Sequence, residues 1–404
     1  MMNKKKIVVI NLGWEQEPLL DKLCEFGVNI YGIHYNGSYY KTPKYKDILI
    51  TDLRDLVKIT KFAEKVKPDA VISDQCDYSY FAQSLIAEKF NLPGPRIEVA
   101  QKATNKYFQR SSAKEKGILI PEFMLCTHLQ ELYDFVEKVG LPIITKPVDN
   151  RGSLGINKIN DKRDIPYAFY DAISNCHSRV VLAEKFIEGV DITVDGYVFQ
   201  GIGPKALGLA TKQKLQDKGG IIDGEIVYPG DLEDDMYNKT IATAEDVASR
   251  LELSFGFFHG EFIITKEKEV YLTEIANRGG GVFTSEIIVP YVSGIDILSV
   301  YIKDVLGMPS DIKNVNVKKI PVLMKFFSFT NLKGKEVKNI RGIKDVADDA
   351  HTLKLKMLIK KGYKIPDIRS GADRHGVIIV TTPKKSQLIP KTKSLLDKLE
   401  VECE

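Results

Sequence analysis

The chain has 404 residues, of which 44% are hydrophobic and 28% charged, and it carries a formal net charge of +4. At roughly 100 to 200 residues per domain this length predicts two or three domains, and the composition excludes a disordered, collagenous or coiled-coil protein. Because 58 Lys and Arg stand against 54 Asp and Glu, the charge gives no reason to expect a nucleic-acid partner.

The five cysteines lie far apart and form neither a CxxC pair nor a Cys/His metal-ligand spacing, so we expect reduced, structural thiols. The first ten residues hold only a short apolar run, and no later run approaches the ~18 apolar residues of a membrane span. These observations predict a cytoplasmic protein with no membrane partner.

Residues 1–95 predict a small parallel α/β domain. Strand-like segments at Lys6–Ile10 and Val28–Tyr35 enclose a helix-like Glu17–Phe26, and a helix at Asp55–Val66 precedes a strand at Ala70–Asp74. Such a succession is typical of βαβ units.

Asp74, Gln75 and Asp77 follow at the carboxyl end of the last of these strands. Open α/β sheets bind ligands at that edge, so these side chains are candidates to hold an amine or hydroxyl group of a substrate. The same residue types also cap helices, and the sequence leaves both interpretations open.

The Pro- and Gly-rich segment Leu92–Pro95 predicts a domain boundary. The pattern of residues 96–313 after it is typical of an α+β domain. Strands dominate residues 141–198, and residues 255–276 predict a hairpin. The expected helices are Glu98–Lys116, Leu129–Val139 and Asp234–Leu251.

Residues 314–404 predict a C-terminal α+β domain. Strands are expected at Ile320–Phe329 and Gly376–Thr381, and helices near Asp345–Lys361 and Pro390–Leu399. The basic run Lys354–Lys364 is interpreted as an exposed helix face.

The most informative segment is an apolar strand that carries Lys146 near its end and leads into Arg151-Gly-Ser-Leu-Gly155. It is neither a Walker A motif, in which GK[ST] opens a helix, nor a GxGxxG turn. Glycines let backbone N–H groups approach an anion, and a fixed lysine supplies the counter-charge, so the segment indicates phosphate binding. A plain hairpin loop with a lysine at its edge is the alternative.

A second pattern is the expected hairpin, in which a turn at Lys266–Glu269 would set Glu261 opposite Glu274 and Ile263 opposite Leu272. Facing carboxylates, with Cβ atoms roughly 4.5 to 5.5 Å apart, destabilise a strand pair unless a cation lies between them. Mg²⁺ suits this position because it takes one or two carboxylates together with nucleotide phosphates. Two exposed surface glutamates are the alternative, which the apolar flanking residues disfavour.

Asn277, Arg278 and Gly279–Gly281 follow the second strand of this hairpin. The planar fork of an arginine matches a carboxylate or phosphate, and three glycines allow the backbone to crowd a ligand. We therefore expect Arg278 to bind an anionic part of the substrate.

Taken in order, these motifs resemble the ATP-grasp superfamily over nearly the whole chain. They are Lys106 within Thr104–Arg110, Lys146 with its Gly-rich loop, Glu184–Ile187, Glu261, and Glu274–Arg278. The resemblance implies an ATP-grasp fold: an N-terminal parallel α/β domain, two α+β lobes that clasp ATP, with residues 120–200 as the mobile nucleotide lobe, and a small C-terminal domain.

The resemblance also implies roles for the matching residues. The phosphates of ATP would contact Lys106, Lys146, Arg151, Gly152, Ser153 and Gly155. The adenine would lie beside Glu184, Lys185, Phe186 and Ile187, and the ribose beside Asp191. Mg²⁺ or Mn²⁺ would bind Glu261, Glu274 and Asn277, although the family often has Glu-x-Asn-x-Arg where this chain has Ala276 in the middle position.

The implied reaction is an ADP-forming ligation in which a carboxylate becomes an acyl phosphate and an amine, or a thiol, attacks it, with Arg278 and Lys146 as catalytic residues. The substrates would be a small carboxylate and a small amine, and a homodimer is compatible with the family. The branch resembled includes L-amino-acid ligases, phosphoribosylglycinamide synthetase and biotin carboxylase. The alternatives are a synthetase of the phosphoribosylglycinamide type, a bicarbonate-activating carboxylase and a non-catalytic nucleotide-binding module. Whether Lys205, Lys212 and Lys214 reach the cleft stays open.

Overall fold

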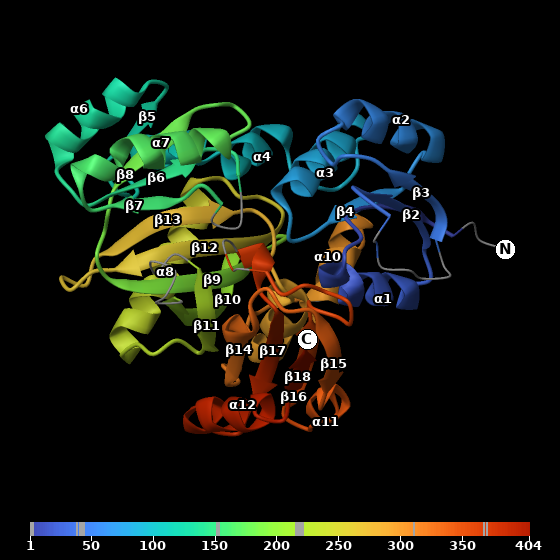
Figure 1. The fold of residues 1–404 in the computed structure, drawn as a ribbon. Coiled ribbons are helices and arrows are strands. Elements are labelled where there is room, and N and C mark those ends of the chain that lie inside the picture. Colours follow the sequence, from blue (N-terminus) through green and yellow to red (C-terminus); the bar gives the residue numbers. More distant parts are fainter. Residues whose placement is uncertain are drawn as a thin grey trace.

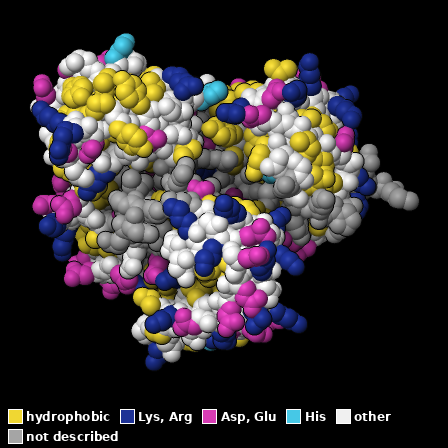
Figure 2. Space-filling model, viewed as in Figure 1, with side chains coloured by type: hydrophobic (Ala, Val, Ile, Leu, Met, Phe, Trp, Pro, Cys, Tyr) yellow, Lys and Arg dark blue, Asp and Glu magenta, His cyan; other side chains and the backbone are white. Residues whose placement is uncertain are grey.

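The computed structural model describes residues 4–37, 39, 45–150, 154–214, 222–309, 312–366, 368 and 371–404. Figure 1 shows the N-terminal domain (blue) on one side and a small lobe on the other, with a larger sheet and the C-terminal segment below them. Figure 2 shows basic and acidic side chains interspersed over the same face, in keeping with the small net charge. The mixed α/β and α+β class is confirmed.

The N-terminal domain is a parallel sheet in the order β3-β2-β1-β4. Its strands are β1 (Lys6–Ile10), β2 (Asn29–His34), β3 (Tyr45–Ile50) and β4 (Ala70–Ser73), and its helices are α1 (Glu17–Glu25), α2 (Leu56–Val66) and α3 (Asp77–Lys89). β1 and β4 are buried along most of their length, which explains why both are uninterrupted apolar runs. The sequence analysis missed β3, a partly exposed edge strand.

The single helix expected over Glu98–Lys116 is wrong. The structure has two helices, α4 (Ile97–Thr104) and α5 (Lys106–Glu115), that break at Asn105. Asn105 has an extended backbone, and its side chain accepts hydrogen bonds from the backbone N–H groups of Tyr107 (3.0 Å) and Phe108 (3.1 Å). An asparagine cap begins a new helix, and this one places Lys106 at the N-terminus of α5.

The small lobe is a four-stranded antiparallel sheet in the order β5-β8-β6-β7, covered by two helices. Its elements are β5 (Phe123–Cys126), α6 (Leu129–Val139), β6 (Ile143–Pro147), β7 (Asn157–Ile159), α7 (Ile165–Ser174) and β8 (Val181–Lys185). The expectation of strands throughout residues 141–198 missed α7. The signal was present, because Pro166 lies in the first turn and Ile165, Ala168, Phe169 and Ala172 recur at helical spacing and are buried.

The large sheet has eight strands in the order β13-β12-β9-β10-β11-β14-β17-β16, with antiparallel neighbours. The strands are β9 (Val190–Phe199), β10 (Gly203–Lys214), β11 (Asp223–Tyr228), β12 (Gly256–Ile264), β13 (Val270–Ala276), β14 (Val322–Phe327), β16 (Thr352–Met357) and β17 (Gly376–Thr381). Because β11 pairs with β14, the sheet runs across the domain boundary expected at residue 313.

The helices around this sheet are α8 (Asp234–Arg250), a π-helical turn (Thr284–Ile288), α9 (Val289–Ser293) and α10 (Ile297–Val305). The C-terminal segment adds α11 (Ile343–Ala347), α12 (Leu388–Leu396) and a two-stranded sheet of β15 (Val337–Arg341) and β18 (Glu400–Cys403).

The helix expected near Asp345–Lys361, with Lys354–Lys364 on its exposed face, is wrong. α11 ends at Ala347, and strand β16 follows. Thr352–Met357 alternates lysines with Leu353, Leu355 and Met357, and this two-residue period is that of a strand.

In the described part of the chain no helix has both the length and the apolar character needed to cross a membrane. All five cysteines are free thiols, as expected.

Gly196 in β9 tests the packing of the large sheet. A Cβ atom there would overlap the ring of Phe258, which is only 1% exposed, and would lie 2.6 Å from the carbonyl oxygen of Lys205. We expect Gly196→Ala to lower the free energy of unfolding by about 1 to 3 kcal/mol, measured by denaturant titration. The control is Gly37→Ala, where a Cβ would meet nothing within 4 Å. Equal stability of the two variants would contradict this packing.

Candidate active site

Lys146, Glu184 and Arg110 form a buried cluster of charges. Nζ of Lys146 on β6 lies 2.6 Å from Oε2 of Glu184 on β8, and Nε of Arg110 on α5 donates a hydrogen bond to Oε1 of the same carboxylate at 2.6 Å. The side chains are 8%, 6% and 0% exposed in that order. Two buried cations therefore share one carboxylate, and the cluster holds one positive charge in excess.

Burial and the neighbouring charges together set the pKa values of the cluster. Burial would raise the pKa of Glu184, but Arg110 and Lys146 hold it below its usual value. Burial also lowers the pKa of Lys146, which Glu184 opposes and Arg110 reinforces. An anion such as a phosphate would supply the missing counter-charge. The side chain of Glu184 is engaged here, so only its backbone is left to border an adenine.

Arg110 had no assigned role in the sequence analysis. The signal for it was its spacing, because residues four apart in a helix share a face, and Arg110 is four residues after Lys106. Its Nη2 group also donates a hydrogen bond to the carbonyl oxygen of Thr273 on β13.

Lys106 joins three segments of the site. Its Nζ atom lies 3.0 Å from Oε1 of Glu274 on β13 and donates a hydrogen bond to the carbonyl oxygen of Asn150 at 3.0 Å. Burial would lower the pKa of Lys106, but Glu274 and Asp77 raise it. In the sequence Asn150 directly precedes the Gly-rich segment, so Lys106 contacts the residue before it.

Glu261 pairs in register with Glu274 across β12 and β13, as expected. A register shift between Glu261 and Phe262 makes Ile263 pair with Tyr271, so the expected pairing of Ile263 with Leu272 is wrong. Each glutamate has a lysine partner: Nζ of Lys212 lies 2.6 Å from Oε1 of Glu261. Burial would raise the pKa of Glu261, but Lys212 and His259 hold it well below its usual range.

His259 is a site residue whose role the sequence analysis missed. Its Nδ1 atom lies 2.7 Å from Oδ1 of Asp195, and the hydroxyl of Tyr228 donates to Oδ2 of Asp195 at 2.6 Å. Its Nε2 atom lies 3.8 Å from Oε1 of Glu261. Burial would lower the pKa of His259, but Asp195 and Glu261 raise it to about 9. The available signal was the strand, because His259 is two residues before Glu261 and shares its face.

Arg278 is held by Asp77 at the N-terminus of α3. Nε of Arg278 lies 2.6 Å from Oδ1 of Asp77, Nη2 lies 3.3 Å from Oδ2, and Nη1 donates to the carbonyl oxygen of Gly279. Burial would lower the pKa of Arg278, but Asp77 raises it. The guanidinium fork therefore already grips a carboxylate in the way expected for a substrate carboxylate.

Asn277 is fully engaged within the protein. Its Oδ1 atom accepts a hydrogen bond from the hydroxyl of Tyr80 at 2.6 Å, and its Nδ2 group donates to the carbonyl oxygens of Phe255 and Phe257. Both ends of this amide, which is 1% exposed, are satisfied. We therefore do not propose Asn277 as a metal ligand, contrary to the expectation from the sequence.

The other expected nucleotide residues surround the same region. Nζ of Lys185 donates to the carbonyl oxygens of Gly140 and Leu141, so this side chain stays on the small lobe. Nζ of Lys158 lies 3.6 Å from the centre of the Phe186 ring. Ile187 is half-buried, Oδ1 of Asp191 lies 4.0 Å from Nζ of Lys214, and Gly155 has a φ of +77°. Arg151, Gly152 and Ser153 lie outside the described residues.

The lysines of β10 differ from one another. Lys205 pairs with Glu245 on α8, whereas Lys212 reaches Glu261 and Lys214 pairs with Asp223. Only Lys212 therefore contacts an expected metal ligand among these pairs.

Asp74 does not cap α3, because its Oδ1 atom accepts hydrogen bonds from the backbone N–H groups of Gln75 and Gly279. Its Oδ2 atom lies 2.5 Å from Oγ of Ser285, which also lies 3.0 Å from Oε2 of Glu286. One hydroxyl hydrogen cannot serve two carboxylates. Burial raises the pKa of Asp74, and burial together with Asp74 raises that of Glu286 well above 4.5, so this pair shares a proton.

The shared proton predicts a dependence of stability on pH. Since the folded pKa of Glu286 lies above its unfolded value, its contribution is complete below about pH 4.5 and is lost as the pH rises through the folded pKa. Glu286→Gln keeps a neutral hydrogen-bonding side chain at every pH. Between the unfolded and the folded pKa of Glu286, we expect the free energy of unfolding of this variant to rise relative to that of the wild type by about 1.4 kcal/mol per pH unit. Thermal melts from about pH 5 to 9 measure this difference.

Glu115→Gln, at the exposed end of α5, is the control for this experiment. It should follow the wild type at every pH. A stability difference between Glu286→Gln and the wild type that stays constant with pH would rule out the shared proton.

Comparisons with known proteins identify the fold around this site. Residues 139–286 match the family model described as the ATP-grasp domain. The chain is 25% identical over 238 residues to the L-arginine-specific L-amino acid ligase of Bacillus subtilis, covering 57% of each chain. It is 22% identical over 323 residues to the uncharacterized protein y4rH of Sinorhizobium fredii, covering 78% of this chain and 65% of that one. The chain thus spans less than two thirds of the length of these relatives.

Two solved structures resemble the whole chain. The L-amino acid ligase of Bacillus licheniformis superposes with a TM-score of 0.85 at 18% identity, and coverage is 100% for both chains. Phosphoribosylglycinamide synthetase of Anaerococcus prevotii superposes with a TM-score of 0.77 at 18% identity, again with 100% coverage of both. At these identities the likeness shows the fold.

Proposed function

The chain carries an ATP-grasp domain and has an ATP-grasp fold, and from this premise we propose that it is an ADP-forming ligase that activates a carboxylate as an acyl phosphate and transfers the acyl group to an amine. The observation that carries the proposal is the buried cluster of two cations, Arg110 and Lys146, around the single carboxylate of Glu184. This cluster lies next to a hairpin on which two carboxylates, those of Glu261 and Glu274, face each other. A phosphate chain and its metal ion complement these two features.

The phosphates of ATP are assigned to Lys146 and Lys106. Lys146 is buried and shares the carboxylate of Glu184 with Arg110, so a phosphate oxygen would neutralise the remaining positive charge. Lys106 contacts Asn150, which precedes the Gly-rich segment in the sequence, and backbone N–H groups of such a segment are suited to an anion. These contacts act in a partly dry environment, where electrostatic stabilisation is strongest.

Mg²⁺ is assigned to Glu261 and Glu274. Within the residues that the structure describes, no group of three or more His, Cys, Asp or Glu side chains could hold a metal ion by itself. Two carboxylates in register nevertheless fit Mg²⁺, because this ion completes its oxygen shell with nucleotide phosphates and water. Bound there, it would neutralise phosphate charge during transfer, while Lys212 and Lys106 hold the two carboxylates in place.

Arg278 is assigned to the substrate carboxylate. In the reaction an oxygen of that carboxylate attacks the γ-phosphorus of ATP. The bond between the γ-phosphorus and the bridging oxygen breaks, and its electron pair stays on ADP. The ammonium substrate loses one proton, and the neutral amine attacks the acyl carbon. The C–O bond breaks with its electron pair on the phosphate, and the nitrogen loses a second proton. One of the two protons leaves on the phosphate as HPO4²⁻, and the other is released to solvent. Arg278 would exchange Asp77 for the substrate, and His259, charged at neutral pH, adds a positive group beside Glu261.

Lys146→Ala tests the phosphate site. Because Arg110 still neutralises Glu184 in this variant, we expect the fold to survive. The affinity for Mg²⁺-ATP should fall at least ~10-fold and turnover at least ~100-fold, measured by calorimetry and by ADP release. Lys205→Ala is the matched control, since Lys205 pairs with Glu245 on α8. Unchanged nucleotide affinity in Lys146→Ala would remove the basis of the proposal.

Hydroxylamine trapping tests the chemistry. With a panel of amino acids and other small carboxylates, the right acid should yield a hydroxamate together with ADP and phosphate. Arg278→Lys keeps the charge near Asp77 but loses the two-pronged grip, so hydroxamate formation should fall by roughly 10- to 100-fold while ATP affinity stays close to wild type. Formation of AMP and pyrophosphate would exclude the acyl-phosphate route.

A further inference from the structure

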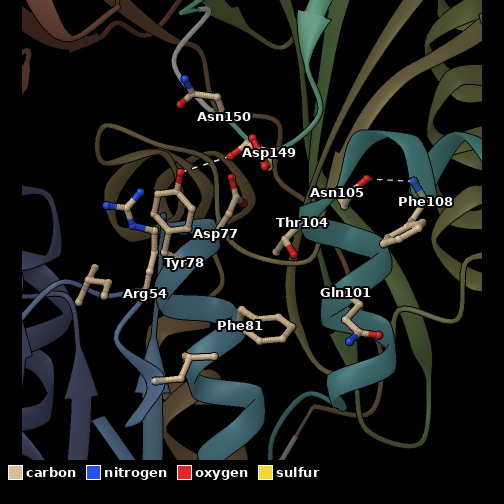
Figure 3. A pocket seen from close by; sticks show the side chains of 12 residues that line it. Arg54, Asp77, Tyr78, Phe81, Gln101, Thr104, Asn105, Phe108, Asp149 and Asn150 are labelled. Carbon is tan, nitrogen blue, oxygen red and sulfur yellow. Dashed lines mark hydrogen bonds between the residues drawn. The ribbon is translucent and has the colours of Figure 1, made fainter. Parts of the chain in front are cut away.

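A cavity of about 440 Å³ lies beside the proposed phosphate site, which it adjoins at Asn150. Figure 3 shows that its walls come from α3, α4, the start of α5 and the segment around Asp149. Tyr78, Phe81 and Phe108 contribute aromatic rings, and Leu56 closes the side next to α2. Cavities of this size and apolar character hold small organic ligands.

The charges of the wall favour a positively charged ligand. Within the described lining, two carboxylates, those of Asp77 and Asp149, stand against one guanidinium, that of Arg54. Arg54 is bound by Asp52 through Nε (3.0 Å) and Nη2 (2.6 Å), and Asp77 is bound by Arg278. Asp149 accepts hydrogen bonds from the uncharged backbone N–H groups of His177 and Ser178 and so keeps its negative charge on the wall. The Arg54 group also lies over the Tyr78 ring, 5.6 Å from its centre. Aromatic faces attract cations and repel anions, so the rings add to the same preference.

The cavity adjoins the place where the acyl group would form. Asp77 lines the cavity and also binds Arg278, the group assigned to the substrate carboxylate. Asn150 lines it too, and the carbonyl oxygen of Asn150 accepts a hydrogen bond from Lys106, the partner of Glu274. A ligand bound here would therefore present one end to the reacting groups and keep its body between α3 and α5.

We propose that this cavity binds the amine substrate, a primary ammonium with an aromatic or aliphatic body, with its ammonium group at Asp77. The inference rests on the proposed function and names the class of its second substrate. An ammonium ion at Asp77 competes with Arg278 for the same carboxylate. Binding of the amine thus frees the guanidinium for the acid, so the two substrates support each other's binding.

Direct binding of a probe tests the cavity without nucleotide or acid. Phenethylamine carries an ammonium and an aromatic body, and 3-phenylpropionate is its anionic counterpart. We expect the whole protein to bind phenethylamine at least ~10-fold more tightly than 3-phenylpropionate in calorimetry, because only the cation complements Asp77. Equal or tighter binding of 3-phenylpropionate, or no binding of phenethylamine, overturns the proposal.

Gln101→Trp fills the cavity from the exposed side of α4, and Gln130→Trp makes the same change on α6, away from it. Phenethylamine affinity should fall at least ~10-fold in the first variant and stay unchanged in the second, with Mg²⁺-ATP affinity unchanged in both. Phe108→Ala, which removes an exposed ring of the wall, serves as a second variant and should weaken phenethylamine about 3-fold.

The outcomes separate this inference from the proposed function. Loss of the probe preference with intact Mg²⁺-ATP binding and hydroxamate formation overturns the amine site alone. The other outcome is that the variants change phenethylamine affinity as expected but the protein binds no ATP. The cavity is then still a cation site, but its ligand is not the substrate of a ligase.

Discussion

The carboxylate of Glu184 is the interaction on which the arrangement of the site depends. It binds Lys146 on the neighbouring strand of the small lobe and Arg110 on α5, and Arg110 continues to the carbonyl oxygen of Thr273 in the large sheet. One buried anion thus connects the small lobe, the linking helix and the large sheet. Buried ion pairs contribute little net stability, but removing one member leaves an uncompensated charge, so this cluster fixes geometry more than it stabilises the fold.

A second constraint is the close approach of the chain at Gly279 and Gly280. A Cβ on Gly280 would lie 2.8 Å from Nδ1 of His259 and 2.9 Å from Oδ1 of Asp195, and a Cβ on Gly279 would overlap Ser285. The backbone therefore passes between the N-terminal domain and the large sheet only because side chains are absent. Val282 and Phe283, with φ of +58° and +63°, continue the turn in a conformation unfavourable for such residues.

The sequence predicted what local pattern determines. Apolar runs identified β1 and β4, and the spacing of Glu261 and Glu274 about a four-residue turn gave their pairing correctly. The errors arose where one residue outweighs the pattern, as Asn105 does by ending α4 and capping α5. Lys354 and Lys356 on β16 were misread because charge was weighed above the two-residue alternation.

The roles of Arg110, Asp77 and His259 depend on contacts between residues far apart in the chain. Arg110 meets Glu184 across 74 positions, and Arg278 meets Asp77 across 201. Local spacing places Arg110 on the face of Lys106 and His259 on the face of Glu261, but it does not identify their partners in the rest of the chain. The sequence therefore predicted which residue types belong to a phosphate and carboxylate site. Only the structure identifies the residue with which each charged side chain pairs when no ligand is bound.

Those partners explain how so many buried charges coexist before any ligand binds. Lys106 with Glu274, Lys212 with Glu261 and Arg278 with Asp77 are pairs of one cation and one anion. Lys146, by contrast, shares the carboxylate of Glu184 with Arg110. Because each charge is already held by its partner, a ligand exchanges one ionic contact for another and does not have to strip water from an isolated ion. The site is thus arranged in advance, and Lys146, with its unbalanced charge, is the position where an incoming phosphate gains most.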